Sequence, residues 1–168
     1  YKGVSQSKLS EYFDADHAYS KALEADPKNA WAWYYKGLNL GNLGQYREAL
    51  DAFSKAVDIK KDYPSAWFMK AFCHLILNTP ELALNAADKA LNLTINNQNS
   101  ALLYMRGIAE DLLGNPSLNP SLYWFNRAIE LDRQNAFIWN RKYLTLKGIG
   151  LDKEAEEASA KADELGYV

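Results

Sequence analysis

AWAWYYKGLNLGNLG, residues 30–44, places two tryptophans and two tyrosines within the five positions from Trp31 to Tyr35. Lys36 and Gly37 follow at once. A helix that covers a single core needs only one apolar stripe. Aromatic residues on several sides therefore indicate a helix with neighbours on more than one side.

The Lys36-Gly37 pair belongs to an internal repeat. Equivalent pairs occur at steps of 34, 34, 36 and 36 residues, as Lys2-Gly3, Lys36-Gly37, Lys70-Ala71, Arg106-Gly107 and Lys142-Tyr143. In the same register, Trp33 is repeated by Trp67, Leu103 and Trp139. A period of this length is typical of arrays in which each unit is one supersecondary element.

A second column of residues lies downstream of the first in every unit. Its members are spaced i, i+4 and i+7, which places each triplet on one face of a helix. The triplets are Ala15, Tyr19 and Ala22; Ala49, Phe53 and Ala56; Ala83, Ala87 and Ala90; Ser121, Phe125 and Ala128; and Ala155, Ser159 and Ala162. Turn residues separate the two columns at Gly44, Asn78, Gly114 and Gly150. Each unit is therefore predicted to hold two amphipathic helices with a turn between them.

The second unit resembles the tetratricopeptide repeat motif, in which Trp, Leu-Gly, Tyr, Ala, Phe, Ala and Pro recur over 34 residues. The matching residues are Trp33, Gly37, Gly44, Tyr46, Ala49, Phe53 and Ala56, with Pro27 closing the unit before. The resemblance implies an all-α fold, a right-handed superhelical solenoid of antiparallel helix pairs. We expect a single domain over residues 1–168, with repeats at about 1–29, 30–63, 64–99, 100–135 and 136–168. The first repeat begins within the motif, so we expect its first helix to be truncated and upstream residues to exist.

The first helix of the second unit has two apolar faces. Trp33, Gly37 and Leu40 share the face that meets the partner helix, while Trp31 and Tyr35 lie on the opposite face. In the family, first helices line the concave surface of the superhelix, so the resemblance implies an apolar and aromatic groove there. The predicted contact residues are Trp31, Tyr34, Tyr35, Phe68, Met69, Phe72, Tyr104, Met105, Phe137 and Arg141. Arg141, the one charged member, is expected to orient a carboxylate of the partner.

The stripe of apolar residues formed by these predicted contact positions has a second interpretation, because first helices in a stack contact several neighbours. The stripe is then mostly packing between repeats rather than an open groove. Trp31 and Phe137, early in their helices, are expected to protrude, and Leu112 is expected to lie in the core. Both interpretations remain open at the level of the sequence.

The resemblance also argues against one known mode of binding. Some members of the family grip a C-terminal carboxylate with two lysines, two asparagines and an arginine on three successive first helices. From the second unit onward, the corresponding positions hold Tyr34, Leu38, Met69, Ala101 and Met105. A partner with an apolar or amphipathic face fits these residues better than a chaperone tail does.

The predicted function is a non-catalytic scaffold for a peptide or helix of another protein. Alternatives are a self-associating segment that forms a homo-oligomer, a structural segment that packs on its own parent protein, or a regulatory domain of a larger protein. The net charge of −2 gives no indication of a nucleic-acid or membrane partner. No leader and no apolar run of transmembrane length is evident, which favours the cytoplasm.

The sequence contains no recognisable catalytic motif, and we expect neither enzymatic activity, nor a cofactor, nor a metal site. The two histidines, His17 and His74, lie in different units without ligand spacing. Cys73 and His74 are adjacent on a helix and point about 100° apart, so a Cys–His nucleophile pair is not expected. The basic column from Lys2 to Lys142 follows the repeat period and is interpreted as long side chains that cover apolar surface.

Overall fold

The computed structural model describes residues 6–94, 98–114 and 120–167. Within these ranges the chain forms nine α-helices and no strand. The helices are α1 (Gln6–Ala25), α2 (Ala30–Asn42), α3 (Tyr46–Ile59), α4 (Pro64–Ile76), α5 (Pro80–Asn92), α6 (Ser100–Leu113), α7 (Pro120–Leu131), α8 (Ala136–Gly148) and α9 (Asp152–Glu164). None of the helices in the described part of the chain combines the length and apolar character that crossing a bilayer requires.

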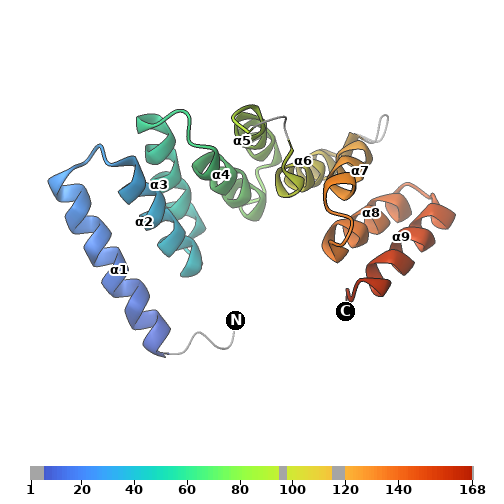
Figure 1. Ribbon diagram of the computed structural model, residues 1–168, viewed down its shortest axis with the longest axis horizontal. Coiled ribbons are helices and arrows are strands. Elements are labelled where there is room, and N and C mark those ends of the chain that lie inside the picture. The colour runs from blue at the N-terminus through green and yellow to red at the C-terminus, as the bar shows by residue number, and fades with distance from the viewer. Residues whose placement is uncertain (1–5, 95–97, 115–119, 168) are drawn as a thin grey trace.

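Helix pairs follow one another along an arch, with α1 at one foot and α9 at the other (Figure 1). The most extensive contacts join α2 to α3, α4 to α5, α6 to α7 and α8 to α9, and each pair also packs on the next. Among the first helices of the pairs, α4 and α6 touch directly. The predicted all-α solenoid of helix pairs is confirmed.

A glycine against a phenylalanine ring holds two of the helix pairs together. Gly37 is buried in α2, and a Cβ atom there would lie 2.7 Å from Cε1 of Phe53 in α3. Gly107 in α6 meets Phe125 in α7 in the same way. Both rings are fully buried, so each pair closes only because the glycine has no side chain. The predicted packing of the Trp33–Gly37 face on the partner helix is confirmed.

The turn inside each pair depends on a residue with positive φ. Gly44, Asn78, Gly114 and Gly150 have φ values of 77°, 55°, 66° and 78°. Glycine adopts this left-handed region without steric cost, and asparagine tolerates it better than most residues do. The equivalent position in the first unit is Ser10, which is helical, and α1 runs unbroken from Gln6 to Ala25.

The unbroken α1 corrects one expectation. We expected the first unit to retain part of a first helix around Lys2-Gly3, followed by a second helix. Lys2 and Gly3 lie outside the described residues, and from Gln6 onward the first unit contributes a single helix. The reason is the absence of a residue suited to positive φ at Ser10, because without one the backbone continues as a helix.

Three tryptophans tie the start of a first helix to the loop before it. The indole Nε1 of Trp33 donates to the carbonyl oxygen of Pro27 at 3.0 Å. Trp67 donates to Lys61 at 2.9 Å, and Trp139 donates to Arg133 at 3.0 Å. The same bond to the residue six positions earlier recurs in three units, which gives the tryptophan column a structural role.

The basic column also packs within the structure. Lys36 donates a hydrogen bond to Ser20 at 2.8 Å, and Arg106 forms an ion pair with Asp88. The charged groups of Lys70, Arg106 and Lys142 lie 5.0, 4.2 and 5.4 Å from the ring centroids of Trp67, Trp124 and Trp139. The interpretation of this column as structural is therefore confirmed for its described members.

Candidate functional site

The predicted contact residues differ widely in exposure. Trp31 and Phe137 are 54% and 66% exposed, as expected for residues in the first turn of their helices. Tyr35 and Phe72 are also exposed, whereas Met105 is only 6% exposed. The remaining five, Tyr34, Phe68, Met69, Tyr104 and Arg141, are partly buried. The stripe is therefore divided between packing and open surface.

Leu112 was expected in the core, and this expectation is wrong. Its side chain is 44% exposed. It lies in the last turn of α6, about 140° around the helix from Gly107, the residue that faces α7. On that side of the last turn, no helix of the described residues packs closely enough to bury the leucine.

An apolar groove runs between α4 and α6. Its cavity has a volume of about 530 Å³. The lining residues are Phe68, Met69, Phe72, Leu75, Ile76, Ala101, Tyr104, Met105 and Ile108. The structure thus brings five of the ten predicted contact residues together in one cavity, with Met105 among its most buried members.

The α4–α6 groove offers almost no polar group. Among the described residues no charged side chain lines it, and the polar side-chain groups are the hydroxyl of Tyr104 and the thioethers of its two methionines. Burial raises the pKa of Tyr104, so its hydroxyl stays protonated at neutral pH. A ligand in this groove therefore finds almost entirely apolar contact area.

A second surface is the aromatic cluster, defined here as Tyr19, Trp31, Tyr34, Tyr35 and Tyr63. The rings of Tyr19 and Tyr35 are nearly parallel, with centroids 6.2 Å apart and planes at 16°. Tyr35 and Trp31 continue this arrangement at 6.3 Å and 22°. Tyr63 lies 5.3 Å from Trp31 and 5.0 Å from Tyr34. The ammonium of Lys60 lies 5.6 and 5.3 Å from the Trp31 and Tyr63 ring centroids.

One hydroxyl of the aromatic cluster is unsatisfied. Tyr63 is 5% exposed, and its buried hydroxyl has no hydrogen-bond partner within the described ranges. Burial raises the pKa of Tyr63 to about 12, with the neighbouring Tyr34 as a second cause. Tyr34, in contrast, forms a hydrogen bond with Ser65. An unpaired buried hydroxyl costs free energy that a ligand with an acceptor atom could recover.

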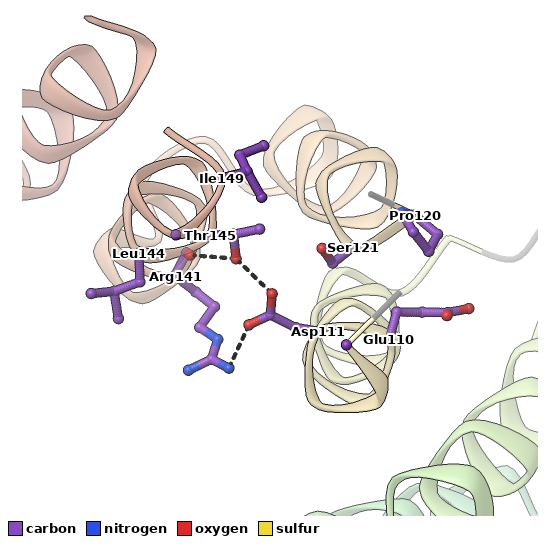
Figure 2. Close-up of a pocket in the computed structure, with 10 residues that line it drawn as sticks. Glu110, Asp111, Pro120, Ser121, Arg141, Leu144, Thr145 and Ile149 are labelled. Carbon is purple, nitrogen blue, oxygen red and sulfur yellow. Dashed lines mark hydrogen bonds and ion pairs between the residues drawn. The ribbon is translucent and has the colours of Figure 1, made fainter. Parts of the chain in front are cut away.

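Arg141 is engaged by its own protein. Its Nη2 donates to Oδ2 of Asp111 at 2.7 Å, and the hydroxyl of Thr145 donates to Oδ1 of the same carboxylate at 3.1 Å (Figure 2). These residues border a pocket of about 330 Å³ between α6, α7 and α8. A partner carboxylate would have to compete with Asp111 for the guanidinium.

Phe137 lies apart from the groove and from the aromatic cluster. Its neighbour is Tyr167, whose ring is 5.5 Å away and nearly perpendicular. Gly166, with a φ of 83°, turns the chain after α9 at this point. Of the ten predicted contact residues, five line the α4–α6 groove, three belong to the aromatic cluster, and Phe137 and Arg141 lie on α8.

Sequence reasoning missed Tyr19, Tyr63 and Tyr167. Tyr19 had been assigned to the packing column of the first unit, and Tyr63 and Tyr167 lie in segments that follow second helices. Tyr63 directly precedes Pro64, the first residue of α4. A search for aromatic residues in the connecting segments, as well as on the first helices, could have found two of these three.

The remaining candidates for chemistry are structural. Among the described residues, no group of three or more His, Cys, Asp or Glu side chains could hold a metal ion. Cys73 is buried, and burial raises its pKa to about 11, which keeps the thiol protonated. His74 is also buried, and its Nδ1 lies 2.9 Å from the hydroxyl of Thr79 at the start of α5.

Comparison with protein families identifies the repeats. Two family models, both described as tetratricopeptide repeat, match residues 18–51 and residues 36–101, and together they span half of the chain. No curated protein matches the sequence.

Solved structures with the same fold are numerous. MamA from Desulfovibrio magneticus RS-1 superposes with a TM-score of 0.86 at 20% identity, over 96% of this chain and 90% of that one. YrrB, described as a TPR protein with an unusual peptide-binding site, superposes with a TM-score of 0.81 at 26% identity. The match covers 95% of this chain and 80% of the YrrB chain. The first TPR of Spaghetti (RPAP3), bound to the HSP90 peptide SRMEEVD, superposes with a TM-score of 0.64 at 22% identity. The match covers 71% of this chain and 94% of the RPAP3 chain.

Proposed function

Because the chain belongs to the tetratricopeptide repeat family, we propose that it is a non-catalytic scaffold that holds a helical segment of a partner protein in the α4–α6 groove. The observation that carries this proposal is the chemistry of the groove. Nine residues of the described part of the chain line it, and none of these nine is charged.

The polarity of the groove favours a helix over an extended peptide. A bound segment must satisfy its own backbone N–H and C=O groups, and each group left without a partner costs about 1–3 kcal/mol. An extended peptide would leave several such groups against apolar side chains. A helix satisfies them internally and presents apolar side chains at i, i+3, i+4 and i+7, which is a known mode of binding in apolar grooves.

The structural neighbours support peptide binding in general terms. YrrB is described as having a peptide-binding site, and the RPAP3 domain is bound to a peptide that contains two glutamates and an aspartate. In this chain, the clamp positions at Tyr34, Leu38 and Met69 carry no positive charge. An apolar helical face is therefore the better match for this surface.

Selection from a displayed library of random peptides tests the proposal without knowledge of the partner. Peptides of about 16 residues form about four helical turns. The native chain serves as bait, with counter-selection on Phe72→Glu, which puts a charge into the groove. Leu82→Glu is the matched control, because Leu82 is 55% exposed on α5 and does not line the groove.

We expect the selected peptides to carry apolar residues at helical spacing and to bind the native chain and Leu82→Glu equally. Binding to Phe72→Glu should be weaker by about tenfold or more, the effect of losing a central apolar contact. Circular dichroism confirms that each variant is folded. Selected sequences without helical periodicity, or equal binding to Phe72→Glu, would count against a helix in this groove.

A further inference from the structure

We propose that the aromatic cluster is a second and independent docking surface, and that it binds an extended proline-rich segment flanked by an acidic residue. This proposal goes beyond the helix-binding groove and does not depend on it. It uses different residues, on α1, α2 and the segment before α4. It rests on the spacing of the rings, on the ring edges that remain accessible, and on the unpaired hydroxyl of Tyr63.

The spacing of the rings matches the polyproline II helix. Tyr19, Tyr35 and Trp31 stand nearly parallel at steps of 6.2 and 6.3 Å. A polyproline II helix rises about 3.1 Å per residue, so two of its residues span about 6 Å. Ridges of aromatic side chains with notches between them are the surface that such helices bind. Trp31 and Tyr35 are exposed, so this row is open to a ligand.

The arrangement of the rings disfavours other ligands of aromatic surfaces. Nucleic-acid bases stack on free ring faces, and sugars pack on them in the same way. Here Tyr35 has Tyr19 on one side and Trp31 on the other, and Trp31 also contacts Tyr63. What remains accessible is mainly ring edges. A cationic ligand is disfavoured because the ammonium of Lys60 already lies beside Trp31 and Tyr63.

The hydroxyl groups of the cluster favour an extended backbone. A polyproline II helix has no internal hydrogen bonds, so all its carbonyl oxygens are free to accept. An α-helix has already used most of its carbonyls and could not use these donors. The buried hydroxyl of Tyr63 has no partner among the described residues, and in the proposed complex it donates to such a carbonyl after a local shift of the groups that bury it. Lys60 adds a positive charge at the edge of the cluster, which suits a carboxylate next to the prolines.

Titration calorimetry with synthetic peptides tests the proposal. The probe is an oligoproline of about ten residues with glutamate at both ends, and the charge control has lysine at both ends. We expect the glutamate peptide to bind the native chain more tightly than the lysine peptide. Tyr35→Ala should weaken binding about tenfold, as expected for an aromatic anchor. Tyr63→Phe, which removes only the hydroxyl, should weaken it severalfold.

Phe72→Ala is the matched control, since it removes an exposed aromatic ring from the α4–α6 groove and leaves the cluster intact. It should leave oligoproline binding unchanged, so the outcomes for the two surfaces are separable. The proposal is overturned if the glutamate peptide fails to bind at about 1 mM, or if it binds Tyr35→Ala and Tyr63→Phe as tightly as the native chain. Preferential binding of oligouridylate or of a glucan hexasaccharide at Trp31 would overturn it as well.

Discussion

Two glycines of α2 show how much a single methyl group can matter. At Gly37, a Cβ atom would lie 2.7 Å from the ring of Phe53, whereas at Gly41 it would meet nothing within 4 Å. Gly37→Ala should therefore lower the free energy of unfolding by about 1–3 kcal/mol, the usual cost of overpacking a core. Gly41→Ala should raise it by up to about 1 kcal/mol, because alanine favours the helix.

Urea denaturation of the native chain and the two variants measures this difference. The variants share a helix and a chemical change, so the contrast isolates the contact with Phe53. An unchanged midpoint for Gly37→Ala would show that the two helices can separate without cost at this point.

The packing between paired helices was predictable from the repeat, whereas the exposure of individual side chains was not. Gly37 was assigned to the interface because it shares a helix face with Trp33 and Leu40 and its position recurs in each repeat. The packing on Phe53 follows from that assignment. Leu112 was misplaced because a helical wheel shows which side a residue is on and not whether a neighbour covers that side. Its exposure depends on how closely the next helix approaches.

At the scale of the helices, the junction between α4 and α5 contains a titratable contact. Nδ1 of His74 in α4 lies 2.9 Å from the hydroxyl of Thr79, which in turn donates to the carbonyl oxygen of His74 at 3.1 Å. Burial, and to a lesser degree Lys70, lowers the pKa of His74 below its ordinary value of 6.5. The folded state therefore holds this histidine in its neutral form.

Stability should decrease as the pH falls below about 6.5, because the unfolded chain then binds a proton that His74 resists in the folded state. Above that pH, the contribution of His74 is fully present. His74→Leu, which introduces the residue that the second unit has at Leu40, should remove this part of the pH dependence. Urea denaturation at about pH 7.5 and about pH 5.5 measures the difference between the two proteins. Parallel changes in both proteins would assign the pH dependence to other groups.

The helices themselves were largely predictable from their ends. Gly44, Asn78, Gly114 and Gly150 interrupt the pattern where the backbone needs positive φ, and each marks the turn after a first helix. The unbroken α1 was not predicted, because the repeat pattern led us to expect a turn that Ser10 does not provide. A search for the residue that permits the turn would have been more accurate than a search for the period.

At the scale of the whole molecule, Asp111 links the last two units. It accepts hydrogen bonds from Arg141 and Thr145 on α8, while it belongs to α6. In a solenoid, stability is close to a sum over units and the interfaces between neighbours. Asp111→Asn should therefore weaken one interface, by about 1 kcal/mol for a partly exposed pair, and leave distant units unchanged.

Hydrogen exchange followed by mass spectrometry resolves this effect along the chain. We expect faster exchange in α8 and α9 of Asp111→Asn, with α2 to α5 unaffected. Asp58→Asn is the control, because its ion pair with Lys61 is exposed and lies within one unit. Uniformly faster exchange in Asp111→Asn would mean that the array unfolds as one cooperative block.

The binding surfaces were only partly predictable, because they combine residues from different kinds of segment. The column of first helices indicated apolar residues such as Phe68, Met69 and Phe72, and these three line one cavity. It gave no information on Tyr63, which reaches the cluster from the segment before α4, or on Asp111, which occupies the guanidinium of Arg141. Contacts between segments of different units depend on the curvature of the array, which no single repeat encodes.

The aromatic cluster extends to Tyr63, the residue directly before α4, and α4 also lines the α4–α6 groove. A partner that carries a proline-rich stretch followed by an amphipathic helix can engage both at once. The second contact then forms within one complex, at an effective concentration in the millimolar range for a short flexible connection. Each contact alone can be weak and dissociate quickly, while the two contacts together bind the partner with high affinity. Selectivity then resides in the order and separation of two short segments rather than in either of them.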